Sequence, residues 1–248
     1  MAEFTDYKKQ LSKQLSLKLK EFGFSRLGMR FRLETEKFLF IIKIDSNRFK
    51  QLDLDFGLQP KAIKKLGTFV TYDFKKLDPI DCEIRKMINR SGGKPYWETS
   101  AGAAGIEKNV DGMLKVIKRQ VMPVVNRFVA NPDLFDSISP ADLLDREGIT
   151  ATFGGAWPVG EETRTAWMFA VYYEHSDIAR AKSFAQFAVD NHRSSLVDRS
   201  KTLKELLDLE IPFGSAVGIE PSDINETFFG EQDLTRILNK TIGKPSKP

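Results

Sequence analysis

The stretch FLFIIKI, residues 38–44, is a run of apolar residues broken by a single lysine, and it decides how the first half of the chain folds. As a strand it places Phe38, Phe40 and Ile42 on one face and Leu39 and Ile41 on the other. A strand that is apolar on both faces is normally central in its sheet and covered on both sides. It is far shorter than the roughly 20 apolar residues that span a bilayer, so we expect no membrane segment.

The segments on either side of this stretch alternate strictly between apolar and charged residues. In MRFRLE, residues 29–34, Phe31 lies between Arg30 and Arg32, and in QLDLDFGL, residues 51–58, Asp53 and Asp55 alternate with apolar residues. Such alternation predicts strands with one apolar and one charged face. Further strands are predicted at 67–74 and in a hairpin formed by DCEIRKMIN (81–89) and PYWETS (95–100).

Helical spacing of apolar residues surrounds these strands. One helix is predicted over residues 4–22, with Gly23 as its left-handed stop, and another over 106–130, divided by Pro123. Ser139 and Pro140 predict the start of a short helix that Gly148 ends. Residues 152–162 read as a loop, residues 163–192 as two helices turning near 175–177, and two more helices follow from 201 and near 231–240, before a frayed tail at 243–248.

These elements predict an α+β fold with an antiparallel sheet packed with helices, followed by a C-terminal helical region. The expected domains are residues 1–132, which hold the sheet, and residues 133–248, a helical region packed on the first. Hydrophobic residues make up 41% and charged residues 29% of the chain, a balance typical of globular proteins.

Charge is distributed unevenly along the chain. Residues 1–130 carry a balance of +11 and residues 131–248 a balance of −7. The split is typical of a nucleic-acid-binding half or of two halves that attract each other, and the absence of any block of five or six like charges favours the second. The start of the chain has no apolar run of the secretory type, and one cysteine, Cys82, excludes an internal disulfide, so we expect a cytoplasmic protein.

Asp53 and Asp55 are the best paired carboxylates in the sequence. Their spacing puts them on one strand face, close enough for acid–base chemistry or for binding a hard cation. The favoured interpretation makes them partners of Arg30 and Arg32 in a cross-strand charge lattice. If the arginines are instead unpaired, they form a surface for an anionic partner. Phe31 points away from both arginines, which disfavours a base-stacking, RNA-binding sheet.

Residues for metal or cofactor chemistry are scarce. The chain has two histidines, His175 and His192, and Cys82, and none of them stands at a zinc-ligand spacing. Neither GxxxxGK[ST] nor GxGxxG occurs, so no phosphate-binding loop is predicted. We therefore expect no cofactor and no tightly bound metal.

The first half resembles a known family through a helix that runs into a Gly-Phe-x-Arg-x-Gly-like stretch and through a late aromatic pair. These residues are Gly23, Phe24, Arg26 and, one place late, Gly28, with Tyr96 and Trp97 as the pair. The stretch from about residue 8 to 130 resembles the bacterial domain of unknown function 4304 family. The resemblance implies helices on an antiparallel sheet, transfers no catalytic residues, and hints at protein binding, because some small bacterial domains of this kind are encoded near toxin systems. Residues 170–192 also resemble one tetratricopeptide-type hairpin, but no second copy occurs and a local helix pair is favoured.

The leading functional prediction is a bacterial, cytoplasmic, non-catalytic protein that binds another macromolecule and resembles an immunity protein. The expected partner is another protein, with nucleic acid disfavoured and no membrane. A hydrolase or nucleotide-handling enzyme that uses Asp53 and Asp55 stays open, as does nucleic-acid binding by the basic N-terminal half. The candidate binding residues are Arg30, Arg32, Asp53, Asp55, Tyr96 and Trp97.

Overall fold

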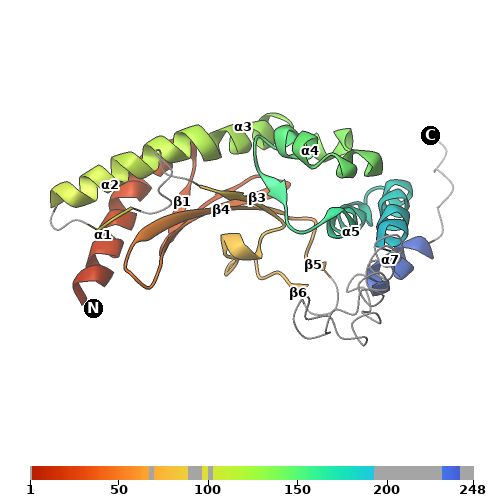
Figure 1. The fold of residues 1–248 in the computed structure, drawn as a ribbon, viewed down its shortest axis with the longest axis horizontal. Helices are drawn as coiled ribbons and strands as arrows, with labels where there is room; N and C mark the ends of the chain where they lie inside the picture. The colour runs from red at the N-terminus through yellow and green to blue at the C-terminus, as the bar shows by residue number, and fades with distance from the viewer. Residues whose placement is uncertain (1, 67–69, 89–96, 100–102, 193–230, 241–248) are drawn as a thin grey trace, which may run out of the picture. The chain divides into compact units, whose positions relative to one another are not determined.

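A computed structural model describes residues 2–66, 70–88, 97–99, 103–192 and 231–240 (Figure 1). The chain forms two compact units, one from Met1–Lys64 and Tyr72–Val159, the other from Lys65–Thr71 and Gly160–Pro248. The predicted fold class is confirmed, since an antiparallel sheet packed with helices precedes a helical C-terminal region. The domains predicted at 1–132 and 133–248 stay a prediction. Among the described residues, no helix is long and apolar enough to cross a membrane.

The first unit begins with α1 (Ala2–Leu19), which continues into the 3-10 helix η1 (Lys20–Phe22). Leu11, Leu15 and Leu19 are fully buried, and their spacing of four residues makes them one stripe of the helix. Gly23 ends the helical segment with a φ of 83°, and its N–H donates to the carbonyl of Lys20. Glycine adopts this left-handed conformation without a steric penalty, so the predicted helix and its stop are both confirmed.

Six strands form one antiparallel sheet in the order β1-β2-β3-β4-β7-β8. They are β1 (Ser25–Leu27), β2 (Arg30–Glu34), β3 (Phe38–Ser46), β4 (Leu52–Pro60), β7 (Ile84–Met87) and β8 (Trp157–Pro158). The apolar stretch forms most of β3, which pairs with β2 on one side and with β4 along its whole length on the other. Residues 38–42 are all buried, as predicted for a central strand.

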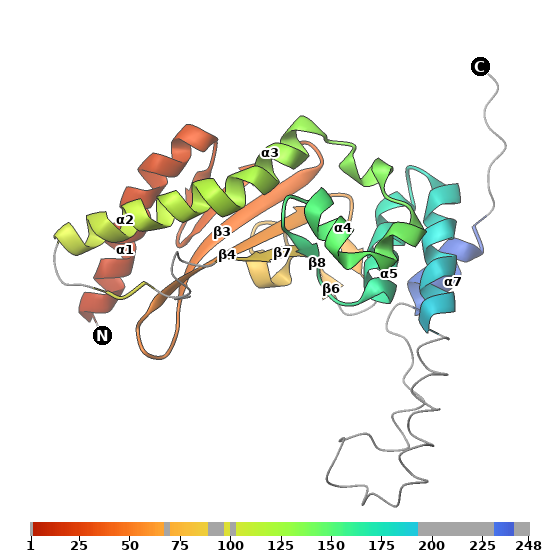
Figure 2. The ribbon, with the colours of Figure 1, turned by 45° about the horizontal axis from the view of Figure 1, so that its top comes forward.

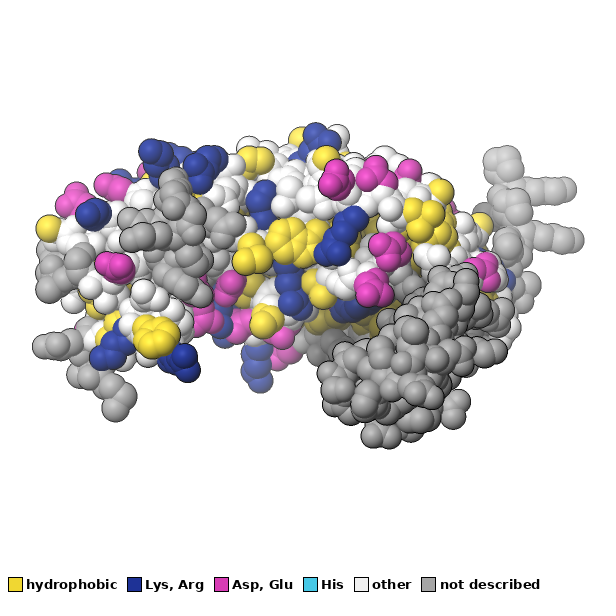
Figure 3. All heavy atoms as spheres, in the orientation of Figure 1, with side chains coloured by type: hydrophobic (Ala, Val, Ile, Leu, Met, Phe, Trp, Pro, Cys, Tyr) yellow, Lys and Arg dark blue, Asp and Glu magenta, His cyan; other side chains and the backbone are white. Residues whose placement is uncertain are grey.

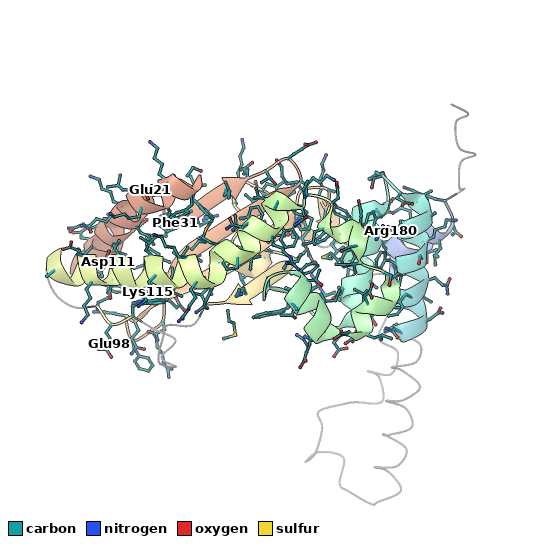
Figure 4. All side chains as sticks on the ribbon, turned by 90° about the horizontal axis from the view of Figure 1, so that it is seen from above. Glu21, Phe31, Glu98, Asp111, Lys115 and Arg180 are labelled. Atoms are coloured by element: carbon teal, nitrogen blue, oxygen red, sulfur yellow. The ribbon has the colours of Figure 1, made fainter. Side chains whose placement is uncertain are left out.

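One long helical segment covers the apolar face of this sheet (Figures 1 and 2). It consists of α2 (Ala103–Val116), a π-helical turn (Ile117–Val121) and α3 (Met122–Ala130). The ring of Phe128 in α3 lies 5.0 Å from that of Phe38 and 6.4 Å from that of Phe40, measured between centroids. Figure 4 views the layer from its helical side and labels Phe31 of β2, which is fully buried between sheet and helices.

The π-helical turn lies directly before Pro123, the residue predicted to divide this helix. Proline has no N–H to donate, and its ring collides with the carbonyl four residues earlier in a regular α-helix. A wider π turn is one way to absorb that conflict. The division is therefore confirmed, and it takes the form of a local change of helix type within a continuous segment.

Two predictions between residues 139 and 162 are wrong. The single short helix ending at Gly148 is in fact two, the 3-10 helix η5 (Pro140–Leu144) and α4 (Arg146–Thr152), after the earlier turn η4 (Leu134–Ser137). Asp145 separates them and caps α4 by accepting the N–H of Gly148, which therefore lies inside a helix. The predicted loop at 152–162 contains β8, where Pro158 is tolerated because β8 is the edge strand.

The second unit is mainly helical. It contains α5 (Glu162–Tyr173), a helix over residues 178–192 and α7 (Glu231–Leu238), so the helix pair turning near 175–177 and the last helix are confirmed. Of the strand predicted at 67–74, residues 67–69 lie outside the described residues, and β6 (Val70–Thr71) pairs with β5 (Lys65–Leu66) in a sheet separate from the main one. The hairpin predicted from residues 81–89 and 95–100 is wrong for its described residues, because β7 pairs with β4 and β8, and Trp97 pairs with Leu52 of β4. The helix predicted from 201 and the tail at 243–248 lie outside the described residues.

Candidate functional site: the charged face of the sheet

The strand register gathers charged residues on the face of the sheet opposite the helices. Arg30 lies directly across from Lys43, Lys43 from Asp55, and Asp45 from Asp53. Directly opposite residues of antiparallel strands point to the same side of the sheet. We call this side the charged face, defined by Arg30, Arg32, Lys43, Asp45, Asp53, Asp55 and Arg85.

A short segment packs onto part of the charged face and adds Asp78 to it. This segment contains the 3-10 helix η2 (Pro79–Asp81), which lies on the side of the sheet away from α2 and α3 in Figure 1. A Cβ at Gly57 of β4 would lie 2.7 Å from the Cα of Pro79 and 2.7 Å from the Sγ of Cys82. Only a residue without a side chain at position 57 permits this close approach, which brings Asp78 over the sheet.

The predicted lattice between the two arginines and the β4 aspartates is wrong. Arg30 Nε lies 3.1 Å from Asp78 Oδ1, and Arg32 pairs with Glu34 of its own strand at 3.1 Å. The physical reason is that β3 lies between β2 and β4, so the two sets are separated by two strand spacings of about 4.8 Å each.

Lys43 is the centre of the actual ion-pair network. Its Nζ lies 2.9 Å from Asp45 Oδ2 and 2.9 Å from Asp78 Oδ2. Burial by itself would lower the pKa of Lys43, but its hydrogen bonds and attraction to the two aspartates raise that pKa above the ordinary value. Burial would raise the pKa of Asp45, and the bonds from Lys43 and from the Ser46 N–H lower it. Both groups are therefore held in their charged forms.

Asp53 and Asp55 lie in a different electrostatic environment. Burial, followed by repulsion from Asp55 and Asp45, raises the pKa of Asp53 to about 6. Burial, followed by repulsion from Asp45, also raises the pKa of Asp55. The Oδ1 atom of Asp53 is buried and has no hydrogen-bond donor in the described part of the chain. This pair is thus a site where negative charge is poorly compensated.

The aromatic pair does not join this site. Trp97 is 2% exposed, and its backbone exchanges hydrogen bonds with Leu52 at the end of β4. Its indole lies against Gly112 of α2, where a Cβ would be 3.2 Å from the indole nitrogen, so Trp97 belongs to the apolar core. Tyr96 lies outside the described residues.

Residues of other chemical types limit what the site can do. Cys82 is buried beneath η2, and burial raises the pKa of its thiol, which opposes its use as a nucleophile. Within the described ranges, no three His, Cys, Asp or Glu side chains are grouped so as to hold a metal ion. The arrangement can bind a cationic group, or it can hold a proton on Asp53 near neutral pH.

Sequence reasoning overlooked Lys43, Asp45, Asp78 and Arg85 as members of the site. One signal was present, since Asp78 followed by Pro79 is a typical start of a short helix, and the structure forms a capping box there. Lys43 is also the one charged residue within the apolar run of β3. Both features point to a polar side of the sheet that receives another segment.

Helices on the apolar face of an antiparallel sheet, with a charged face opposite, define the first unit as an α+β domain with a candidate binding surface. Residues 15–127 match the family described as "Domain of unknown function (DUF4304)", which confirms the resemblance predicted for the N-terminal half. The match includes every residue of the charged face. No curated protein and no solved structure matches the chain.

Proposed function

We propose that the N-terminal unit binds another protein through its charged face, and that a Lys or Arg side chain of the partner lies against Asp53 and Asp55. The observation that carries this proposal is the buried Oδ1 atom of Asp53, which has no donor among the described residues. A cationic side chain lying against the exposed Asp55 and the half-buried Asp53 would offset the repulsion between the two carboxylates and favour their ionised forms.

Exposed apolar side chains beside these carboxylates support a protein as the partner. Met87 lies directly across from Asp55, and Ile80 lies in η2, and each is 68% exposed. Leu27, directly across from Arg30, is also exposed. Figure 3 shows acidic, basic and hydrophobic side chains close together along the lower side of the sheet layer. Protein interfaces combine such apolar contacts with a polar rim and are enriched in Met and aromatic residues.

The finer proposal is that the protein is a bacterial, cytoplasmic, immunity-like inhibitor, and the charged face supports its inhibitory part. Such an inhibitor acts by covering its partner with a surface of complementary charge, and it needs no catalytic residue. The charged face supplies ion pairs that orient its own side chains and an acidic pair that is left for the partner. A partner with a basic surface therefore fits this proposal.

An enzyme is the second candidate, and the raised pKa of Asp53 is the observation that favours it. A general acid or base works best when its pKa lies near the working pH. Arg85, whose charge acts on Asp55, would then orient an anionic group of the substrate. This reading predicts turnover that is lost in Asp53→Asn, whereas the binding reading predicts no turnover.

A titration with small peptides tests the binding proposal directly. Acetylated, amidated Lys-Leu is added to carbon-13-labelled protein, and the carboxyl resonances of Asp53 and Asp55 are followed by NMR. We expect both resonances to shift and the pKa of Asp53 to fall, because the cation favours the ionised form. The Asp53→Asn/Asp55→Asn variant should lose at least tenfold in affinity. Asp111→Asn, which removes an exposed carboxylate on α2 (Figure 4), is the matched control and should bind normally. Equal binding of Glu-Leu, or equal binding by the double variant, would contradict the proposal.

A further inference from the structure

The hairpin that joins β3 to β4 ends in an exposed aromatic side chain. Its two strands continue past their neighbours, because the ladder with β2 ends at Lys43 and the ladder with β7 begins at Asp55. Beyond these points the described residues add one bridge, between Leu52 and Trp97. Figures 1 and 2 show the hairpin extending beyond the other strands of the sheet. Phe49 lies in its turn and is 68% exposed.

Hydrogen bonds within the turn fix its conformation. The Oδ1 atom of Asn47 accepts the N–H of Phe49 at 2.9 Å and that of Gln51 at 3.1 Å, and the Nδ2 atom donates to Gln51 Oε1 at 2.8 Å. Lys50 has a φ of 60°, a left-handed conformation that residues with a side chain rarely adopt. Strained positions of this kind cluster at functional sites. A turn fixed in this way loses little conformational entropy when it binds a ligand.

Two aromatic rings at this end of the unit each carry a cation. The guanidinium carbon of Arg48 lies 4.8 Å from the ring centroid of Phe49, and Lys8 Nζ lies 5.8 Å from that of Phe4 in α1. Lys8 also donates to Ser46 Oγ at 2.9 Å, so it connects α1 to the hairpin. Figure 3 shows basic side chains on both sides of hydrophobic ones at the end of the hairpin. We call this surface the hairpin patch, defined by Phe4, Lys8, Arg48, Phe49 and Lys50.

The charge of the hairpin patch suits an anionic ligand. Its three cations are accompanied by no carboxylate of the patch itself. Aspartates on the same elements, Asp6 and Asp45, already pair with Lys9 at 3.8 Å and Lys43 at 2.9 Å. Asp45 belongs to the charged face, whereas Ser46, which alternates with it along β3 and contacts Lys8, points to the helical side. The sheet therefore separates the patch from the acidic pair on β4.

The positions of the two rings favour a ligand that stacks. Phe4 is only partly exposed and lies against the protein, so it cannot insert into a lipid layer together with Phe49. Stacking of a base needs only one free ring face, and successive bases of a single strand stack on aromatic side chains beside a basic groove. On β2 the arginines and Phe31 point to opposite sides of the sheet, which disfavours such a site there. On the hairpin the rings and the cations lie on one surface.

We propose that the hairpin patch binds single-stranded nucleic acid. Bases stack on the free ring faces of Phe49 and Phe4, and phosphates lie against the three cations of the patch. RNA and DNA are bound alike, because every base has a π face and the phosphates are common to both. This site is separate from the charged face and does not depend on the function proposed for it.

Fluorescence anisotropy with fluorescein-labelled oligothymidine and oligouridine of about ten nucleotides, added to the full chain at low salt, tests the stacking. Both should bind wild type. Phe49→Ala and Phe49→Leu should each lose about fivefold or more in affinity, because leucine keeps the apolar bulk but offers no ring face. Phe49→Trp keeps a ring face and should bind within about twofold of wild type. Leu144→Ala removes an apolar side chain that is 64% exposed outside the patch, so it is the matched control and should bind normally.

The salt dependence of the same binding tests the phosphate contacts. Arg48→Gln/Lys50→Asn removes two cations, and asparagine accepts the left-handed conformation of position 50. This variant should lower the slope of log affinity against log salt by about 1.4, since each phosphate contact to a single strand contributes about 0.7. Lys75→Gln/Lys76→Gln removes two exposed cations outside the patch and should leave the slope unchanged.

Four results would overturn the proposal. They are no binding of either oligonucleotide, equal binding by Phe49→Leu and wild type, equal slopes for Arg48→Gln/Lys50→Asn and wild type, and tighter binding of a duplex of the same length. Vesicles of phosphatidylcholine and phosphatidylserine provide the remaining comparison. Vesicle binding that persists in Phe49→Leu, together with no oligonucleotide binding, would make the patch a membrane contact and would equally overturn a nucleic-acid site.

Discussion

Replacing Arg30 by Met and Asp78 by Asn, singly and together, measures the ion pair that joins β2 to the segment over the sheet. Met keeps an apolar stem of similar reach, and Asn keeps an oxygen that can cap η2. At the 3.1 Å separation of Arg30 Nε and Asp78 Oδ1, two unit charges attract by roughly 1.3 kcal/mol in water and by roughly 5 kcal/mol at an effective dielectric constant of 20.

Most of that attraction is offset by desolvation and by the ordering of two side chains. The two side chains are 28% and 26% exposed, which places the pair between a surface and a buried ion pair. We therefore expect a coupling free energy of about 1 kcal/mol from the double-mutant cycle.

Urea unfolding at pH 7.5, followed by circular dichroism, gives the four free energies of unfolding that the cycle needs. The control cycle combines Arg32→Met with Asp53→Asn, a pair set about 16 Å apart by two strand spacings and four residues along the strand. This distance exceeds the Debye length of about 8 Å at physiological ionic strength, so the control coupling should stay below about 0.3 kcal/mol. A coupling free energy near 1 kcal/mol in the control cycle, or no coupling between Arg30 and Asp78, would refute the ion-pair assignment. Either result would instead favour charge pairing between β2 and β4 across β3.

The remaining predictions concern stability. Because the raised pKa of Asp53 means that the folded protein holds this proton more tightly than the unfolded chain, stability falls as pH rises from about 4 to 6. Asp53→Asn should therefore stabilise the protein by about 1 kcal/mol at pH 7.5, after allowance for solvent screening, and by almost nothing near pH 3.5. Urea unfolding measures both effects, and equal stabilisation at the two pH values would contradict this prediction. Gly57→Ala should lower the free energy of unfolding by roughly 1–3 kcal/mol, because the added Cβ overpacks against η2. The control Gly28→Ala meets open space and should lower it by about 1 kcal/mol, because Gly28 has a φ of +66°. Equal losses of stability, with η2 still protected in hydrogen exchange, would argue against the close approach of η2 to Gly57. Phe40→Ala should cost roughly 3–5 kcal/mol and Lys9→Ala less than about 0.5 kcal/mol, and similar urea midpoints would be inconsistent with a buried central strand.

The strands of the main sheet could largely be predicted because their periodicity is a local property. Alternation around Phe31 and in β4 assigns each residue to a face without knowledge of its neighbours. Partners across the sheet are a different matter, because they depend on strand order and register, which are set by packing of the whole unit. Arg30 and Asp55 do share one row of the sheet, but Lys43 lies between them.

The elements that sequence reasoning missed are short and carry loop-like residues. β8 has two residues, one of them Pro158, and follows two glycines, so its local signals are those of a turn. Its strand character comes from pairing with β7, a contact between residues more than seventy positions apart in sequence. Asp145 similarly divides one predicted helix into two, because its side chain caps α4.

The charge expected of the partner depends on which cations of the first unit already form ion pairs within the fold. The N-terminal 130 residues carry a balance of +11, which alone favours an anionic partner. On the charged face, however, the missing side chain at Gly57 lets η2 approach and deliver Asp78 to Arg30 and Lys43. These cations are thereby neutralised within the fold, while the acidic pair on β4 keeps raised pKa values. With Asp78 the charged face holds four basic and four acidic side chains, so it shares little of the excess positive charge of this half of the chain. Local compensation around Asp53 and Asp55, rather than net charge, therefore favours a cationic side chain as the ligand of this pair.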